Sequence, residues 1–172
     1  VEKLKLAGHR VERCFPENFD IENVWQAFGT LAGSEIGLAL PAVERLFFRL
    51  GGAFLPRQQI LSRAFAGGMY ATPGQYNLAL VKREQLITAL ENFLGQWDIW
   101  LCPTAPTVAY PAFPLHRFRP PPSILIDEQP LPYIEATISL TSPFSLTGSP
   151  VVVLQVGVID GLPVGLQVVG RR

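Results

Sequence analysis

Between residues 103 and 132 the chain carries nine prolines, and this density limits the possible folds more than any other property of the sequence. They are Pro103, Pro106, Pro111, Pro114, Pro120, Pro121, Pro122, Pro130 and Pro132. Because proline lacks a backbone N–H and fixes φ, we expect extended or polyproline-like chain here, in a long surface excursion. The basic residues His116, Arg117 and Arg119 within it are interpreted as part of a solvated loop.

Apolar residues before this excursion recur with the 3.6-residue period of amphipathic helices. A long helix is expected from the cap Asp20 to the break at Pro41, and a shorter one from Pro41 to Leu50. After a turn at Gly51-Gly52, Pro56 suits the first position of a third helix. The strongest pattern is that of a fourth helix, with the apolar stripe Leu86, Ile87, Leu90, Phe93, Leu94 and Trp97.

Strand-like patterns occur near both ends and after the fourth helix. Residues 10–14 alternate as in an edge strand, and the apolar run 98–102 is interpreted as a buried strand of a parallel or mixed sheet. The runs 151–156 and 164–169 flank Asp160-Gly161, a pair typical of a hairpin turn.

One more helix is expected between Pro132 and Pro143, with Ile134, Ile138 and Thr141 directed inward. Helices in the middle of the chain and strands around them indicate the α/β or α+β class. We expect one partial domain over residues 1–172, in which helices surround mixed sheet strands.

The composition excludes several classes of protein. A hydrophobic fraction of 48% with 16% charged residues fits a packed globular protein. Lys plus Arg (14) equals Asp plus Glu (14), so no excess charge favours nucleic acid or anionic lipid. No apolar run approaches the roughly 18 residues of a membrane helix, and no signal segment opens the chain. Cys14 and Cys102 lack metal-like spacing and are interpreted as reduced thiols of a cytoplasmic protein.

Three motifs resemble the amidase signature family. Residues 7–12, Ala-Gly-His-Arg-Val-Glu, are similar to its Ala-Gly-His-x-Val-Glu, and residues 98–106 are similar to its Asp, apolar strand and Pro-Thr-x-Pro. Residues 145–170 resemble its Asn-x-x-Gly-x-Pro-Ala-x-Ser-x-Pro-x-Gly, short turn and Gly-Leu-Pro-x-Gly-x-Gln-x-x-Gly. The motifs follow the family's order and span nearly the whole chain, which implies a fragment from the C-terminal half of the amidase fold.

The resemblance implies a chemistry whose main residues this chain lacks. Amide hydrolysis in the family would use a nucleophilic Ser, a second Ser at a cis peptide bond and a Lys base, with an oxyanion held by a Gly-Gly-Ser-Ser-Gly-Gly loop. The sequence contains no such loop. Lys82, beside Arg83 on the polar side of a helix, is interpreted as a solvated ammonium. We assign no catalytic residue, metal ligand or cofactor, and we expect the isolated chain to be inactive.

One wall of a substrate pocket is the remaining candidate site. Ligands of open α/β sheets bind beyond the carboxyl ends of strands, and Pro103, Thr104 and Ala105 have that position after the strand. Thr141 and Phe144 are weaker candidates for substrate binding. The alternative is an ordinary strand end that proline terminates.

The implied parent is an amidase that hydrolyses a small-molecule amide without a cofactor. Two alternatives stay open: the A subunit of a tRNA-dependent amidotransferase, and a truncated or degenerate relative without activity. Ser145, Val153 and Gln155 stand where the family commonly has Asn, Ser and Pro, so the substrate is undetermined. Both ends of the sequence look cut from a longer protein, and we expect self-association through exposed sheet edges or apolar faces.

Overall fold

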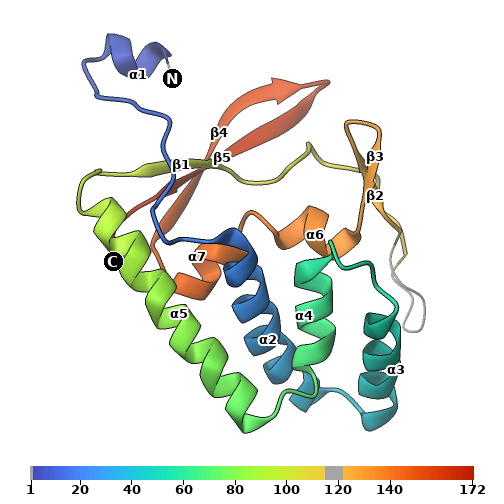
Figure 1. Ribbon diagram of the computed structural model, residues 1–172. Helices are drawn as coiled ribbons and strands as arrows, with labels where there is room; N and C mark the ends of the chain where they lie inside the picture. Colours follow the sequence, from blue (N-terminus) through green and yellow to red (C-terminus); the bar gives the residue numbers. More distant parts are fainter. Residues whose placement is uncertain (1, 115–121) are drawn as a thin grey trace.

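The computed structural model describes residues 2–114 and 122–172, in which a layer of helices lies beside a small sheet (Figure 1). The helices are α1 (Glu2–Leu6), α2 (Ile21–Ala39), α3 (Ala42–Ala53), α4 (Ile60–Gly68), α5 (Pro73–Leu94), α6 (Tyr133–Ile138) and α7 (Ser142–Thr147). The strands are β1 (Trp100–Pro103), β2 (Ile124–Ile126), β3 (Gln129–Leu131), β4 (Val151–Ile159) and β5 (Leu162–Val169). This combination confirms the α/β class.

Two further expectations concern membrane helices and the basic loop. No helix in the described ranges is long and apolar enough to cross a bilayer. His116, Arg117 and Arg119, which were interpreted as a solvated loop, lie outside the described residues.

Helices α2 and α4 approach closely because the contacting face of α2 is built from glycine. The side chain of Asp20 accepts a hydrogen bond from the first turn of α2 at 2.9 Å, which confirms the predicted cap. Three glycines on α2 are buried one turn apart: Gly29, Gly33 and Gly37. A Cβ on Gly33 would lie 2.2 Å from the carbonyl oxygen of Phe65 in α4, so only glycine fits there.

Three local predictions from the first half of the chain were wrong. Gly51 and Gly52 do not form a turn, because α3 continues through them to Ala53 and packs Gly52 against Ala66. The helix expected to start at Pro56 starts at Ile60. Residues 10–14 form no strand and instead run as an irregular arm between α1 and α2.

Helix α5 confirms the strongest periodic pattern. Its first turn has a capping box in which Thr72 and Gln75 bond reciprocally, and Pro73 takes the first helical position. Leu86, Ile87, Leu90 and Leu94 are all buried, as the stripe predicted. Trp97 follows the end of the helix.

The three-stranded sheet has the order β1-β5-β4, and both pairings are antiparallel. The hairpin prediction is confirmed, with positive φ at Asp160 (50°) and Gly161 (79°) between β4 and β5. The prediction of a parallel or mixed sheet for residues 98–102 was wrong, because β1 pairs with β5 in the antiparallel sense.

The proline-rich excursion and the helix after it also differ from expectation. The excursion contains a small hairpin, β2 and β3, and Pro130 is accommodated because a two-stranded pair leaves ladder positions free. The helix expected up to Pro143 is split: α6 ends at Ile138, and α7 begins at Ser142 with Pro143 in its first turn. Glu135 and Ala136 are the buried residues of α6, whereas Ile134 and Ile138 are half-buried.

An aromatic cluster around Trp100 joins the sheet to the helical layer. Its ring centroid lies 5.4 Å from that of Phe15 in the arm, 5.5 Å from Phe93 at the end of α5 and 5.7 Å from Phe144 in α7. Edge-to-face contacts of this kind stabilise a core beyond the burial of area. The start of β1 is therefore fixed against α5 and α7.

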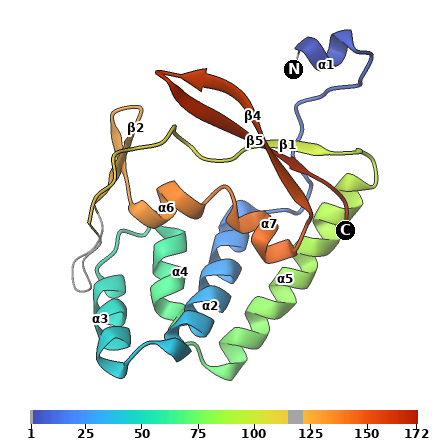
Figure 2. The same cartoon turned by 180° about the vertical axis from the view of Figure 1, so that it is seen from behind.

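Strand β4 is exposed on both faces, although its sequence is apolar. The outer part of the β4–β5 hairpin projects away from the helices (Figure 2). Val152, Val153 and Leu154 are 60%, 55% and 49% exposed, and β4 carries no charged residue from Val151 to Ile159. A strand that is apolar on both faces is typical of the interior of a layered sheet, so this surface is suited to a further protein layer.

Candidate functional site

The five candidate residues come from two segments that meet beside β5. Pro103 ends β1, and Thr104 and Ala105 follow it, whereas Thr141 precedes α7 and Phe144 lies within α7. Figures 1 and 2 both show α7 beneath the crossing of β1 and β5, with α6 to one side of it above α4. We call these five residues the candidate wall.

Thr104 is the most unusual member of the candidate wall. Its backbone N–H donates to the Gly165 carbonyl at 3.3 Å, which extends the β1–β5 pairing by one residue. Its hydroxyl oxygen is buried and has no hydrogen-bond partner among the described residues. A Cβ on Gly165 would lie 2.8 Å from that oxygen, so the glycine makes room for the threonine side chain. A buried hydroxyl without a partner costs about 1–3 kcal/mol, which a ligand or a water could recover.

The other members differ in their access to solvent. Pro103 and Ala105 are exposed at the end of β1. The Thr141 hydroxyl is half-buried and donates to the Ile138 carbonyl at 3.3 Å. Phe144 is only 5% exposed and belongs to the aromatic cluster with Trp100, so core packing alone explains its position.

Gln167 connects the two segments, and the sequence interpretation did not identify it as functional. Its side chain is 3% exposed, and its Nε2 donates to the Pro103 carbonyl at 2.8 Å and to the Leu140 carbonyl at 3.1 Å. The signal in the sequence was a lone amide within the apolar run 164–169. Such a residue needs hydrogen-bond partners once its side chain is buried.

Arg83 also holds the candidate wall in place. Arg83 was predicted on the solvated side of its helix, but its Nε donates to the Leu146 carbonyl at 2.7 Å near the C-terminal end of α7. Gly148 then ends α7 in the left-handed conformation, with φ 70°. The charge of Arg83 complements the C-terminal carbonyls of the short helix.

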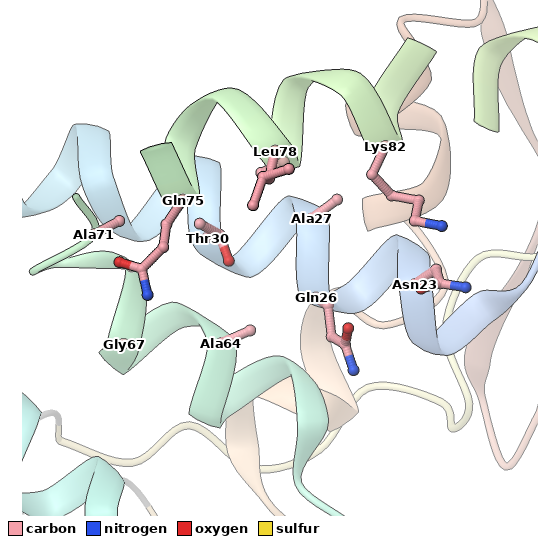
Figure 3. A pocket seen from close by; sticks show the side chains of 12 residues that line it. Asn23, Gln26, Ala27, Thr30, Ala64, Gly67, Ala71, Gln75, Leu78 and Lys82 are labelled. Carbon is pink, nitrogen blue, oxygen red and sulfur yellow. The ribbon is translucent and has the colours of Figure 1, made fainter. Parts of the chain in front are cut away.

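Lys82 lies in a groove of about 390 Å³ between α2, α4 and α5, shown in Figure 3. Its ammonium lies at one end of this groove together with Asn23, while Gln75 and Ala71 line the opposite end. The residues that line the groove include no serine, so Lys82 has no Ser nucleophile beside it here. Lys82 is half-buried in this position, and its interpretation as a solvated cation stays a prediction.

The remaining reactive side chains of the described ranges are the potential metal ligands and the two cysteines. No group of three His, Cys, Asp or Glu residues there is placed to hold a metal ion. Burial raises the pKa of the Cys102 thiol from 9.0 to about 12, so the thiol stays protonated at neutral pH. Cys14 and Cys102 are both free.

Comparison with known proteins places this geometry in a family. The family profile described as Amidase matches residues 1–172. The glutamyl-tRNA(Gln) amidotransferase A subunit of Exiguobacterium sibiricum is 31% identical over 118 residues, which is 66% of this chain and 22% of the relative. Its counterpart in Geobacillus thermodenitrificans is 33% identical over 110 residues, 61% of this chain and 20% of the relative.

Solved structures agree with this match. The crystal structure of an amidase superposes with a TM-score of 0.67 and 28% identity, covering 99% of this chain and 36% of that one. A 6-aminohexanoate cyclic dimer hydrolase shares the fold, with a TM-score of 0.62 and 19% identity over 99% of this chain and 36% of its own. The chain thus spans about a fifth of the curated relatives' length, as the coverages of 22% and 20% state. It belongs to the amidase signature family.

Proposed function

We propose that this chain supplies scaffold and one substrate-pocket wall to an amidase that hydrolyses the C–N bond of a small carboxamide. The observation that carries the proposal is the unpartnered Thr104 hydroxyl, buried at the end of β1 within a family motif. A buried donor and acceptor of this kind is suited to a carboxamide, which offers one carbonyl acceptor and N–H donors. Pro103, Ala105, Thr141 and Phe144 complete the wall in this proposal.

The chemistry itself belongs to residues outside this sequence. In the proposed parent, a Ser attacks the amide carbonyl, a Lys takes its proton through a second Ser, and backbone N–H groups hold the oxyanion. The acyl-enzyme is then hydrolysed by water, which releases the acid after ammonia or an amine has left. No metal or organic cofactor takes part. The 172-residue chain by itself is inactive, because it has no Gly-Gly-Ser-Ser-Gly-Gly loop.

The test compares this chain with the longer product of its coding region. Intact mass and peptide mapping across the region before Val1 establish whether the native product carries the Ser-Ser-Lys residues in frame. Ammonia release is then measured from a panel of primary carboxamides and from L-glutamine. Release by the longer product alone supports the proposal. Hydrolysis by the 172-residue chain would refute its inactivity, and a native product that starts near Val1 without hydrolysis would favour a non-catalytic relative.

A second candidate is the A subunit of a tRNA-dependent amidotransferase. It is favoured by the identities of 31% and 33% to two such subunits. The balanced charge, with 14 basic and 14 acidic residues, does not favour tRNA binding by this chain, so in this candidate the partner subunits supply the tRNA contacts. Release of ammonia from L-glutamine that depends on such partners distinguishes this candidate from an independent amidase. Two free cysteines fit the cytoplasm as the compartment of either enzyme.

We also propose that the isolated chain associates with itself through β4. Exposed, uncharged strand edges are templates for pairing with another chain. Light scattering during size-exclusion chromatography should give a mass that rises with concentration, and Val153→Lys should restore the monomer. Leu125→Lys is the control, because Leu125 is an exposed strand residue (69%) in the separate β2–β3 hairpin. A monomer at every concentration would contradict the proposal.

A further inference from the structure

Gln167 makes two hydrogen bonds that join segments far apart in the sequence. Its Nε2 carries two N–H donors, and one is directed to the Pro103 carbonyl and the other to the Leu140 carbonyl, at 2.8 and 3.1 Å. Only 3% of the residue is exposed, so water does not compete effectively for these acceptors. The amide therefore fixes the distance between the end of β1 and the α6–α7 junction.

The two acceptors stand directly before candidate wall residues. A carbonyl and the N–H of the next residue lie in one rigid peptide plane. Holding the Pro103 oxygen therefore orients the plane that enters Thr104, and holding the Leu140 oxygen orients the plane that enters Thr141. One side chain thereby orients both halves of the candidate wall.

The neighbouring residue on the same face of β5 acts on the same segment. Gly165 and Gln167 are two residues apart, so both point to one face of the strand. Gly165 accepts from the Thr104 backbone N–H and leaves space for its hydroxyl. The position of Thr104 is therefore set from two points on β5.

Few other side chains can do what Gln167 does. Glutamate offers no donor when ionised, and it would direct a buried charge toward two carbonyl oxygens. Asparagine is one methylene shorter, and methionine has the shape of glutamine but no donor. Lysine and arginine carry enough donors but would bury a charge, so among uncharged side chains the double donation is specific to a primary amide of this length.

We infer that Gln167 is a positioning residue that aligns Thr104 with Thr141 for binding of the carboxamide substrate. This inference rests on the proposed function, because it assigns substrate binding to the candidate wall. Gln167 does not itself take part in the chemistry.

The first test uses the 172-residue chain and Gln167→Met, with Gln155→Met as the matched control. Gln155 is an exposed glutamine on β4, so its loss removes no buried hydrogen bond. Backbone amide resonances of Thr104 and Thr141 should both shift in Gln167→Met, since their peptide planes lose the bonded carbonyl. Neither should shift in Gln155→Met. A folded Gln167→Met chain with both resonances unchanged overturns the inference.

A measurement on the unmodified chain covers the case in which Gln167→Met does not fold. The Gln167 side-chain amide protons should give nuclear Overhauser contacts to both Pro103 and Leu140 and should exchange slowly with deuterium. Contacts to only one of the two residues, or fast exchange, overturn the inference.

The last test is kinetic and uses the longer product, if that product hydrolyses a carboxamide. Loss of positioning for substrate should raise KM about tenfold and leave kcat within about twofold, the pattern of lost uniform binding. Gln155→Met should change neither constant. An unchanged KM in Gln167→Met refutes the positioning role. If the resonances of Thr104 and Thr141 shift but no product hydrolyses any carboxamide, the proposed function fails while the structural coupling of the two segments stands.

Discussion

Removal of the Glu135 carboxylate should destabilise the chain more than any surface substitution. Glu135 in α6 is 7% exposed, and its two carboxylate oxygens accept from Ser62, from the backbone N–H at 2.9 Å and from the hydroxyl at 2.6 Å. Ser62 is in the first turn of α4, whose N-cap residue Gln59 makes no side-chain cap. A residue from a distant helix therefore caps α4, and its negative charge faces the positive end of the helix dipole.

The magnitude follows from the two bonds. A hydrogen bond to a charged group contributes about 1.5–3 kcal/mol, and Glu135→Ala loses two while leaving the Ser62 N–H buried without a partner. Release of the carboxylate from a desolvated site offsets part of this loss, so we expect a net cost of about 3 kcal/mol. Glu135→Gln keeps one oxygen for the N–H and can donate to the hydroxyl, so it should cost about 1 kcal/mol.

Thermal unfolding followed by circular dichroism measures the effect. For a chain of this size, about 3 kcal/mol corresponds to a fall in Tm of roughly 6–12 °C. Glu35→Ala is the control, because Glu35 is an exposed glutamate on α2, and it should lie within about 0.5 kcal/mol of the unmodified chain. If Glu135→Ala unfolds within about 1 kcal/mol of Glu35→Ala, the capping role assigned to Glu135 is refuted.

Three further predictions concern helix packing, thiol reactivity and the pH dependence of stability. Gly33→Ala should cost more than about 2 kcal/mol in urea unfolding, because its Cβ meets the Phe65 carbonyl at 2.2 Å. Gly67→Ala in α4 should instead stabilise the chain by about 0.5–1 kcal/mol, since nothing lies within 4 Å of the new methyl group. Equal effects of Gly33→Ala and Gly67→Ala on the free energy of unfolding would contradict this account of the α2–α4 interface. Cys14 is exposed and should react with iodoacetamide in the folded chain. Cys102 should react only on unfolding, because burial raises the pKa of its thiol to about 12. Equal reaction rates of the two cysteines in the folded chain would disprove the protection of Cys102 by burial. Because unfolding returns the Cys102 thiol to its ordinary pKa, its contribution to stability is complete below pH 9.0 and is lost between there and about pH 12.

Local signals in the sequence determined the elements that depend on neighbouring residues alone. The Asp160-Gly161 turn, the Asp20 cap and the apolar stripe of α5 each follow from a few adjacent side chains, and the structure confirms all three. The family was also identified from short motifs, because the spacing of glycine and proline in these turns can be read from the sequence alone. These features require no knowledge of what packs against them.

Only the tertiary structure decided the features that depend on contacts between distant residues. The antiparallel partner of β1 and the helical state of Gly51-Gly52 were predicted wrongly because tertiary packing overrides local propensity. Residues 10–14 form no strand because no described strand pairs with them. The sequence does not reveal the partners of either buried side chain. Glu135 bonds to Ser62, 73 residues away, and Gln167, although visible as a lone amide in an apolar run, bonds to residues that are 64 and 27 positions away. A buried polar side chain has to find a partner wherever the fold brings one, and only the folded chain reveals which residue that is.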